Sequence, residues 1–397
     1  MSWNHVTLDK LGSISRGKSK HRPRNDKTLF GGKYPFIQTA DVKAAGLYLT
    51  EYNETYSDKG LAQSKLWPAG TLCITIAANI ADTTILGIDA CFPDSVMGFI
   101  PYEGVSNVKF VKYAFDILQR DCKKISQGTA QDNLSWKKLS TIKFPAPNIE
   151  VQDKIVSILS MYDDLIENNQ KQIKLLEEAA QRLYKEWFVD LHFPGYEDAK
   201  IVDGVPEGWI HTTVDSFVKL QSGYAFKSNS FDNTGKFKIV TIKNVQDGEF
   251  DGNKVNRIVE IPAKMPSHCK LIEGDTLLSL TGNVGRICTV IGNDYLLNQR
   301  VAKITSDYPC YAYYLFSSEK MFHDMNNLAN GAAQQNLSPI RTGQMKILKP
   351  SEEVLLMFEE MTKPLMHKKI LLNKSIITAT QARDRLLPKL ISGEIEV

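Results

Sequence analysis

The chain has 397 residues, 43% hydrophobic and 23% charged, which is typical of globular proteins and disfavours a disordered or fibrous one; its length predicts two or more domains. No run of 18 apolar residues and no signal-peptide pattern appears, so we expect a cytoplasmic protein with no membrane partner. The net charge of +3 does not by itself indicate a nucleic-acid partner.

The first 147 residues are predicted to form one globular domain. Short apolar runs such as TLCITIA at 71–77, separated by Gly, Pro and Asn, predict strands and turns with a few helices. The densest basic run of the chain, RGKSKHRPRNDK at 16–27, holds six Lys or Arg and one His, and Gly17 and Pro23 keep it out of a regular helix. Residues 1–150 carry 19 Lys or Arg against 14 Asp or Glu, so this domain is the basic part of the molecule.

A long helix is predicted over 148–190, beginning after the sequence APNIE. Core-compatible residues recur along it at heptad spacing: Ile155, Ile158, Tyr162, Leu165, Asn169, Leu176, Ala179 and Leu183. At ~1.5 Å per residue this helix spans on the order of 60 Å, and a single apolar stripe of that length requires a partner. Asn169 and Gln172 on the stripe are expected to fix the register, with exposure to solvent as the alternative.

The same order of elements follows in the second half. A linker at 191–204 leads to a second predicted domain at 205–350, with strand-like runs KIVTIKNV at 238–245 and TLLSLT at 276–281. A second helix is predicted over 351–391, before a tail at 392–397. Its stripe comprises Phe358, Met361, Leu365, Leu372, Ala379, Ala382 and Leu386. Because the two helices match in length and stripe, we expect them to pair within the chain.

Almost the whole chain is two copies of one unit. The phrase GTAQDNLS at 128–135 returns as GAAQQNLS at 331–338, 203 positions later, and the same offset continues without a gap over about sixty residues. Near the N-terminus, WNHVTLDKLGSISRG at 3–17 matches WIHTTVDSFVKLQSG at 209–223. The predicted fold is α+β: two similar mixed α/β domains separated by a long antiparallel two-helix coiled coil, in a pseudo-two-fold tandem repeat.

Five features recur together in this chain: the doubled unit, its W-x-x-x-x-L opening, its G-x-x-Q-x-x-L-S phrase, its P-x-P entry into the helix and the closing RLLPKLISGEI at 385–395. In these features the chain resembles the specificity subunit of type I restriction-modification systems. The resemblance covers essentially the full length. It implies a non-catalytic subunit that binds double-stranded DNA at a bipartite site, one half-site per target-recognition domain. The first long helix begins with EVQDKI at 150–155, and the second, with EEVLLMF at 352–358, lacks the glutamine. The two helices therefore need not contact partner subunits in the same way.

The resemblance also implies partners and cofactors outside this chain. Two methylation subunits would dock on the coiled coil, with S-adenosylmethionine bound to them. A restriction subunit with translocase and nuclease activity would bind ATP, although the sequence leaves its presence open. This chain is expected to hold no cofactor, since it lacks an N/D-P-P-Y/F catalytic loop and a glycine-rich cofactor turn, and no metal ion, since it has no C-x-x-C and no paired His spacing.

On this resemblance we expect DNA contacts from loops of both domains. The basic run would neutralise phosphates or enter a groove, the alternative being a solvated loop. Its counterpart QSGYAFKSNS at 221–230 suits base edges and thymine methyl groups, and its divergence fits a different half-site. The glutamines of the repeated phrase would position phosphates or order the turn, and two further arginines would contact DNA or form surface ion pairs. The candidates are Arg16, Lys18, Lys20, Arg22, Arg24, Gln131, Gln221, Tyr224, Lys227, Asn229, Arg286, Arg300 and Gln334.

Other interpretations compete with this one. A coiled-coil scaffold with two protein-binding domains and no DNA specificity is the principal alternative, and a complete modification enzyme is disfavoured by the missing motifs. The segment TGNVGR at 281–286 lacks the Lys and Ser/Thr of a P-loop and is predicted to be a turn that ends a strand. The six cysteines show no C-x-x-C spacing and are predicted to be small buried hydrophobic residues.

Overall fold

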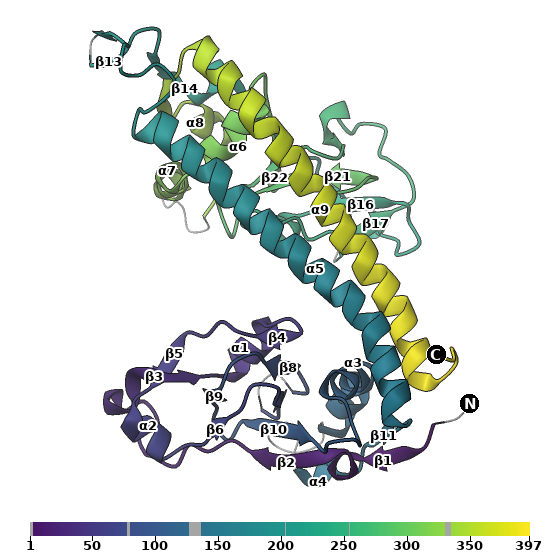
Figure 1. The fold of residues 1–397 in the computed structure, drawn as a ribbon. Helices are drawn as coiled ribbons and strands as arrows, with labels where there is room; N and C mark the ends of the chain where they lie inside the picture. The colour runs from purple at the N-terminus through teal and green to yellow at the C-terminus, as the bar shows by residue number, and fades with distance from the viewer. Residues whose placement is uncertain (1–2, 78–79, 127–135, 203, 254, 330–334) are drawn as a thin grey trace. The chain divides into compact units, whose positions relative to one another are not determined.

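The computed structural model describes residues 3–77, 80–126, 136–202, 204–253, 255–329 and 335–397. The chain divides into two compact units, whose elements are labelled in Figure 1. Unit 1 comprises Met1–Ile166 with Thr378–Val397, and unit 2 comprises Glu167–Ile377. Each unit therefore contains one mixed α/β domain together with a stretch of each of two long helices.

In unit 1, the described residues form two larger sheets. One has the strand order β2-β10-β7-β8-β4 and the other β5-β3-β9-β6. Every residue of β7 and β8 is buried, as expected for apolar runs covered on both faces. The strand bounds are β2 Gly12–Arg16, β3 Phe30–Phe36, β4 Tyr48–Leu49, β5 Glu54–Tyr56, β6 Leu66–Trp67, β7 Leu72–Thr75, β8 Thr83–Leu86, β9 Ala90–Cys91 and β10 Val96–Pro101.

The described part of unit 2 repeats this arrangement, without a counterpart of β4, in the orders β15-β22-β19-β20 and β17-β16-β21-β18. The predicted strand run at 276–281 is confirmed as β19. Of the run at 238–245 only the first three residues lie in a strand, β16, because a 3-10 helix follows at Ile242–Asn244. The segment TGNVGR forms the turn between β19 and β20, as predicted. The strand bounds are β15 Val218–Ser222, β16 Phe237–Val240, β17 Asn256–Ile258, β18 Lys270–Leu271, β19 Thr276–Ser279, β20 Ile287–Thr289, β21 Tyr295–Leu297 and β22 Val301–Ser306.

Corresponding strands of the two units have the same partners. β10 and β22 run antiparallel to β2 and β15, whereas β9 and β21 run parallel to β3 and β16. The glycines that follow β2 and β15 also correspond: the Gly17 amide donates to Val96 O at 2.9 Å, and the Gly223 amide donates to Val301 O at 3.1 Å. A Cβ atom at Gly17 would lie 2.3 Å from a backbone oxygen, and one at Gly223 would lie 2.2 Å from another. The shared topology confirms the predicted repeat.

Shorter elements complete each domain. In unit 1 the amphipathic helix α3 covers the buried core, and β1 pairs with β11; in unit 2 α6 is almost wholly buried, and β14 pairs with β23. The bounds are β1 His5–Thr7, β11 Lys143–Pro145, β14 Ile210–Thr213, β23 Lys346–Lys349, α1 Thr39–Ala44, α2 Asp58–Ala62, α3 Val108–Ser126, α4 Trp136–Leu139, α6 Pro309–Ser317, α7 Glu319–Ala329 and α8 Pro339–Gly343. The strand β12 Ile201–Val202 lies in the predicted linker and pairs with β13 Val205–Pro206, at the start of the second predicted domain.

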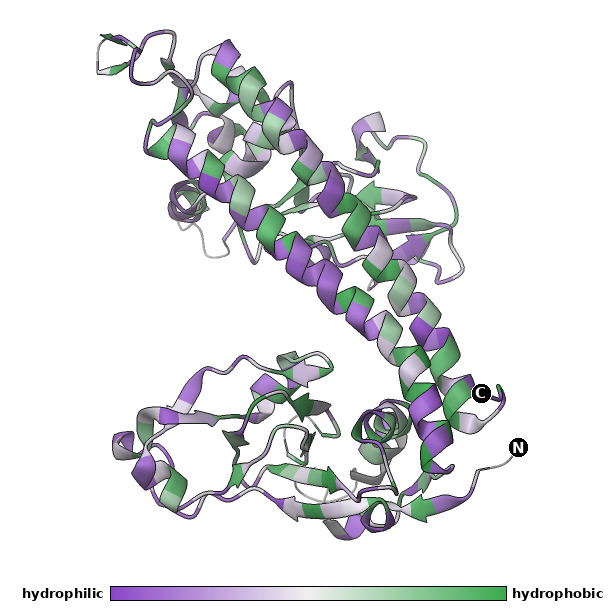
Figure 2. Ribbon diagram, in the orientation of Figure 1, coloured by the Kyte–Doolittle hydropathy of each residue, from purple (hydrophilic) through white to green (hydrophobic). Residues whose placement is uncertain are grey.

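The two long helices are α5, Ile149–Tyr184, continued by a π-helical turn over Lys185–Val189, and α9, Glu352–Ser392. They run side by side in Figure 1, and Figure 2 shows hydrophobic and hydrophilic residues alternating along both. Within unit 2, Asn169 Nδ2 donates to Ser375 Oγ at 2.9 Å, while Glu177 pairs with Lys369, so residue numbers rise along one helix as they fall along the other. The helices are therefore antiparallel. Asn169 is buried between them, as predicted from its place on the stripe.

The stripe was partly misplaced by sequence reasoning. Leu165 and Met361, predicted to lie in the helix interface, are 43% and 52% exposed. The buried positions nearby are instead polar residues, Asp163 and Thr362. Because a buried hydrogen-bonded polar residue looks like a surface residue in a hydropathy pattern, the predicted stripe was shifted onto neighbouring apolar side chains.

All six cysteines are buried, as predicted, and none of them forms a disulfide. No helix within the described ranges is both long enough and apolar enough to cross a membrane.

Candidate nucleic-acid interface

The predicted basic run forms a loop between β2 and a short 3-10 helix at Lys27–Leu29. Arg16 ends β2, where it pairs with Met97, and its side chain is exposed. Lys18, Lys20, Arg22 and Arg24 follow in the loop, each with an exposed side chain. The structure therefore brings the five basic candidates of copy one together on the surface of unit 1.

Two of these cations are engaged by the protein itself. Arg24 Nη2 contacts both carboxylate oxygens of Asp94, at 3.0 and 2.9 Å. Arg22 Nη1 donates to the backbone carbonyls of Ser19 and His21 at 2.7 and 2.8 Å. Both guanidinium groups therefore have partners within the protein, whereas no ion pair with a described residue holds Arg16, Lys18 or Lys20.

A segment far away in the sequence holds this loop in place. Gln63 Oε1 accepts from the backbone amides of Lys20 and His21, at 2.6 and 3.0 Å. Ser64 Oγ donates to the carbonyl of Lys18 at 2.9 Å. The next residue, Lys65, is half-buried, and its burial together with the neighbouring Lys18 ammonium lowers its pKa. Sequence reasoning missed Lys65 because it is the only cation in the segment LAQSKLWPAG at 61–70, 47 positions after Lys18.

At the other end of the loop, His21 and Asp26 form a small polar cluster. His21 Nε2 lies 2.8 Å from Asp26 Oδ2, and Thr28 donates to Asp26 Oδ1 from its hydroxyl and its amide, at 2.7 and 2.9 Å. The hydrogen bonds from Thr28, and the smaller one from His21, hold the pKa of Asp26 well below its usual range. Asp26 is therefore a lasting negative charge within the basic run, and the loop is an ordered element of the fold.

The corresponding loop of unit 2 presents a different surface. Gln221 lies in β15 and is half-buried; Lys227 and Asn229 are exposed at a 3-10 turn over Ser228–Ser230. Tyr224 packs its ring against Phe226, with centroids 5.2 Å apart. Two aromatic rings here replace the lysines of unit 1, so the two loops offer different chemistry at equivalent places in one topology.

The two further arginines of unit 2 differ in their surroundings. Arg286 donates to Gln246 Oε1 through Nη1, and its Nε lies 3.8 Å from Asp247 Oδ2. Arg300 is exposed in the segment before β22, and no ion pair joins its side chain to a described residue. Arg286 therefore forms a surface ion pair, the alternative to DNA contact, whereas Arg300 stays a candidate for DNA contact.

The two glutamines of the repeated phrase, Gln131 and Gln334, lie outside the described residues. The end of the second phrase is described. Leu337 is buried and its amide donates to Leu280 O at 2.7 Å, while the Ser338 hydroxyl caps the start of α8. These last residues of the phrase fix the approach to α8.

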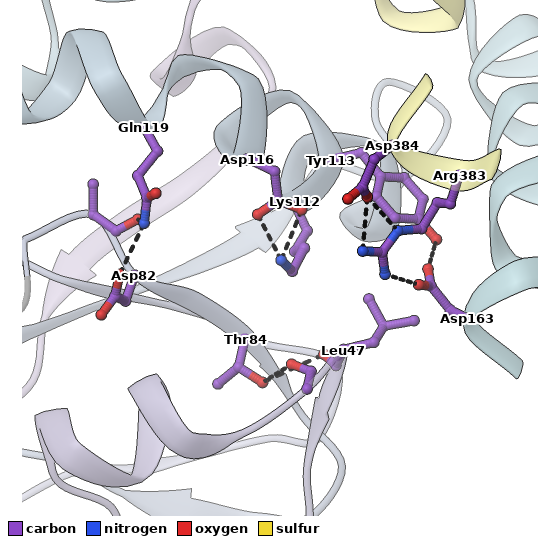
Figure 3. A network of polar contacts seen from close by, with 12 residues as sticks. Leu47, Asp82, Thr84, Lys112, Tyr113, Asp116, Gln119, Asp163, Arg383 and Asp384 are labelled. Carbon is purple, nitrogen blue, oxygen red and sulfur yellow. Dashed lines mark hydrogen bonds and ion pairs between the residues drawn. The ribbon is translucent and has the colours of Figure 1, made fainter. Parts of the chain in front are cut away.

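A polar network of unit 1 joins its domain to both long helices (Figure 3). Tyr113 of α3 donates to Asp163 of α5, and Arg383 Nη1 of α9 donates to the same carboxylate at 2.7 Å. Nearby, Lys112 is 2.6 Å from Asp116, whose pKa burial raises. A cavity of about 780 Å³ opens beside these groups. The charged groups bind one another, so the network is suited to fixing α3 on the helices.

Unit 2 contains a comparable network. Lys369 Nζ of α9 lies 2.5 Å from Glu177 Oε2 of α5 and donates to Tyr313 Oη of α6 at 2.9 Å. Burial raises the pKa of Tyr313 well above its usual value. Among the described residues, no group of three or more His, Cys, Asp or Glu side chains is placed to hold a metal ion.

Comparison with known proteins gives a consistent result. A family model described as "Type I restriction modification DNA specificity domain" matches residues 2–178 and 206–350. The chain is 24% identical to the type I restriction enzyme MjaIX specificity subunit of Methanocaldococcus jannaschii, over 100% of this chain and 94% of that protein. It is 29% identical to the EcoR124I/EcoR124II specificity subunit of Escherichia coli over 46% of this chain and 47% of that one. The S subunit of a type I restriction-modification system from M. genitalium has a similar fold, with a TM-score of 0.62 at 17% identity over 98% of this chain and 96% of that one.

Proposed function

The chain belongs to the family of type I restriction modification DNA specificity proteins, and we propose that its two specificity domains each read one half of a bipartite DNA site. Recognition of DNA as a specificity subunit follows from family membership, and the scaffold alternative gains no support. The observation that carries the bipartite reading is the doubled domain. Two domains with one topology present different loops at the same place, as two unlike half-sites require.

The side chains of the two loops favour different kinds of contact with DNA. Lysines and arginines around the unit 1 loop favour contact with phosphates, which supplies affinity and depends on salt. In unit 2, the half-buried Gln221 and the exposed Asn229 carry amide groups of the kind that pairs with base edges. We therefore expect sequence preference to change when these loops are exchanged for those of a relative.

Catalysis would come from partner proteins. Methylation subunits would supply S-adenosylmethionine, and a restriction subunit, where one takes part, would use ATP. All of these would act in the cytoplasm, where the host DNA lies. Under this proposal the purified chain, incubated alone with S-adenosylmethionine and DNA, transfers no methyl groups; methylation by the chain alone would contradict it.

The long helices offer a surface for the two methylation subunits. Large apolar side chains stay exposed along both helices: Met161, Leu165, Leu175, Leu356, Met361, Leu371 and Ile377. Exposed apolar side chains that lie next to one another indicate contact with another protein. Within unit 1, Met161 and Leu165 are four residues apart and therefore share one face of α5.

The docking surface is tested by the double variant Met161→Glu, Leu165→Glu in the full chain. Burying two added carboxylates would weaken association with the methylation subunits at least tenfold. The matched control is Lys171→Glu, a charge change at an exposed position on the same helix. Unchanged association of the double variant, measured by analytical ultracentrifugation, would remove this face of α5 from the docking surface.

Footprinting of the reconstituted complex tests the main proposal. Two short protected blocks separated by unread base pairs are expected. A relative's unit 2 loop grafted over residues 221–230 should then change the sequence of one block alone. A single continuous block of required bases would contradict the bipartite reading.

A further inference from the structure

Lys18 and Lys65 form a pair of neighbouring cations in unit 1, called here the lysine pair. They come from different elements: Lys18 follows β2 and Gly17, and Lys65 directly precedes β6. The hydrogen bond from Ser64 Oγ to Lys18 O, 2.9 Å long, joins the two segments next to both lysines.

Lys65 is held in place by aromatic packing. Its Nζ lies 3.5 Å from the centroid of the Trp67 ring, within the range of a cation–π contact. Trp67 is 1% exposed and stacks on Phe92 with ring centroids 4.8 Å apart. The ammonium group therefore rests on a rigid part of the core, and its position is defined before any ligand arrives.

Lys18 is fixed by its backbone. There is no room for a side chain at Gly17, because a Cβ atom there would lie 2.3 Å from Phe92 O. The start of the loop therefore packs closely against Phe92, the residue whose ring stacks on Trp67. Gln63 holds the amides of Lys20 and His21 on the other side of Lys18. Both lysines are thus set on backbone that is pinned at several points.

The lysine pair has no anionic partner in the described part of the chain. Other cations nearby do have one: Arg24 contacts Asp94, and Lys59 Nζ lies 3.7 Å from Asp26. Like charges placed side by side repel each other, and Lys65 is partly desolvated as well. Such a pair is stabilised when an anion binds between the two ammonium groups.

We propose that Lys18 and Lys65 together bind a backbone phosphate of DNA at the first half-site. This assignment rests on the proposed function and adds a residue, Lys65, that the basic run does not contain. An ammonium group acts as a point charge and suits a phosphate, whereas base reading favours planar groups with two directed donors. Unit 2 has Tyr224 and the buried Cys269 at the corresponding positions, one after the glycine that follows β15 and the other before β18, so the site belongs to the first domain alone.

The test uses the full chain assembled with its methylation subunits and measures DNA affinity against salt concentration. Loss of one phosphate contact lowers the slope of log K against log salt by about 0.9. Raising the salt concentration from about 50 to about 200 mM reduces DNA affinity by some factor in wild type. In the double variant Lys18→Ala, Lys65→Ala this factor should be about 3.5 times smaller. Binding to specific and nonspecific DNA should weaken by the same factor, because a phosphate contact carries no sequence information.

Two further variants serve as controls. Lys10→Ala removes an exposed lysine of the same unit and should leave the slope unchanged. Lys18→Arg, Lys65→Arg keeps both charges and should restore the wild-type slope. The thermal midpoint of each variant, measured without DNA, shows whether unit 1 remains folded.

The outcomes separate this site from the function as a whole. Normal wild-type binding with an unchanged slope in the folded double alanine variant would overturn the phosphate site alone. Weakened binding to the specific sequence only would show that the pair reads bases and would also overturn the assignment. If the wild-type complex bound no DNA, the proposed function would fall and the site with it.

Discussion

Replacing Lys369 by methionine is expected to destabilise unit 2 strongly. Lys369 Nζ lies 2.5 Å from Glu177 Oε2, and the two side chains are only 5% and 18% exposed. At an effective dielectric constant of about 20, two unit charges at that distance attract each other by ~7 kcal/mol. Desolvation of both ions opposes this by several kcal/mol, so the intact pair contributes little net stability. Removal of one partner leaves Glu177 and the Tyr313 hydroxyl without the cation that both contact.

The expected loss is about 3 kcal/mol, at the lower end of the range for a broken buried pair, because Glu177 keeps some contact with water. For a unit of this size, that lowers the melting temperature by about 6–12 °C. The double variant Glu177→Gln, Lys369→Met leaves no unpaired charge and should regain about 2 kcal/mol. Differential scanning calorimetry of the full chain measures both changes.

An exposed ion pair on α5, the helix that carries Glu177, serves as the control. Lys171 contacts Glu167 four residues earlier, and their side chains are 70% and 47% exposed. Lys171→Met should therefore change stability by no more than about 0.5 kcal/mol. The reasoning would be refuted if Lys369→Met were no more destabilising than Lys171→Met, or if the double variant were less stable than Lys369→Met.

Other substitutions test separate parts of the structure. Gly17→Ala would place a Cβ 2.3 Å from the Phe92 carbonyl oxygen and should cost about 1–3 kcal/mol or more, seen as a lower urea midpoint of unit 1. Arg24→Ala breaks an exposed pair with Asp94 and should cost less than about 1 kcal/mol by the same assay; a larger loss would show that this pair holds the loop. Burial raises the pKa of Glu359, so its contribution to stability is present below its unfolded pKa and is lost as pH rises through its native pKa. Glu359→Gln should therefore gain stability relative to wild type as the pH rises above about 4, and a constant difference would contradict this sign.

Sequence patterns predicted the large features of this fold because those features are repeated or periodic. A helix of 36 residues, Ile149–Tyr184, leaves a long heptad pattern, and a duplicated domain leaves matched phrases 203 positions apart. The expected start of each helix, after Pro147 and after Pro350, agrees with α5 and α9 to within two residues. Patterns of this kind are local in sequence and therefore visible without coordinates.

The chemistry of single side chains was less predictable, because it depends on distant residues. Arg22 and Arg24 look like free cations in the basic run, yet one is held by nearby carbonyls and the other by an aspartate 70 positions away. Lys65 gains its place beside Lys18 only through the packing of β6 and the contacts of Gln63 and Ser64. A sequence lists charges, but the fold decides which of them remain available to a ligand.

The charges between the long helices do not follow the repeat, and this explains why α5 and α9 select each other. In unit 1, α5 supplies Asp163 and α9 supplies Arg383; in unit 2, α5 supplies Glu177 and α9 supplies Lys369. If the charges followed the repeat, unit 2 would have its basic residue on α5 and its acidic residue on α9, the reverse of unit 1. The positions 203 residues away carry no charge: Met366, Ala180, Thr380 and Ile166. Pairing of α5 with α5 of a second chain would bury carboxylates without cations, which costs several kcal/mol per ion. The polar residues therefore favour pairing of α5 with α9 over pairing of α5 with another α5, although the apolar stripes of the two copies are alike.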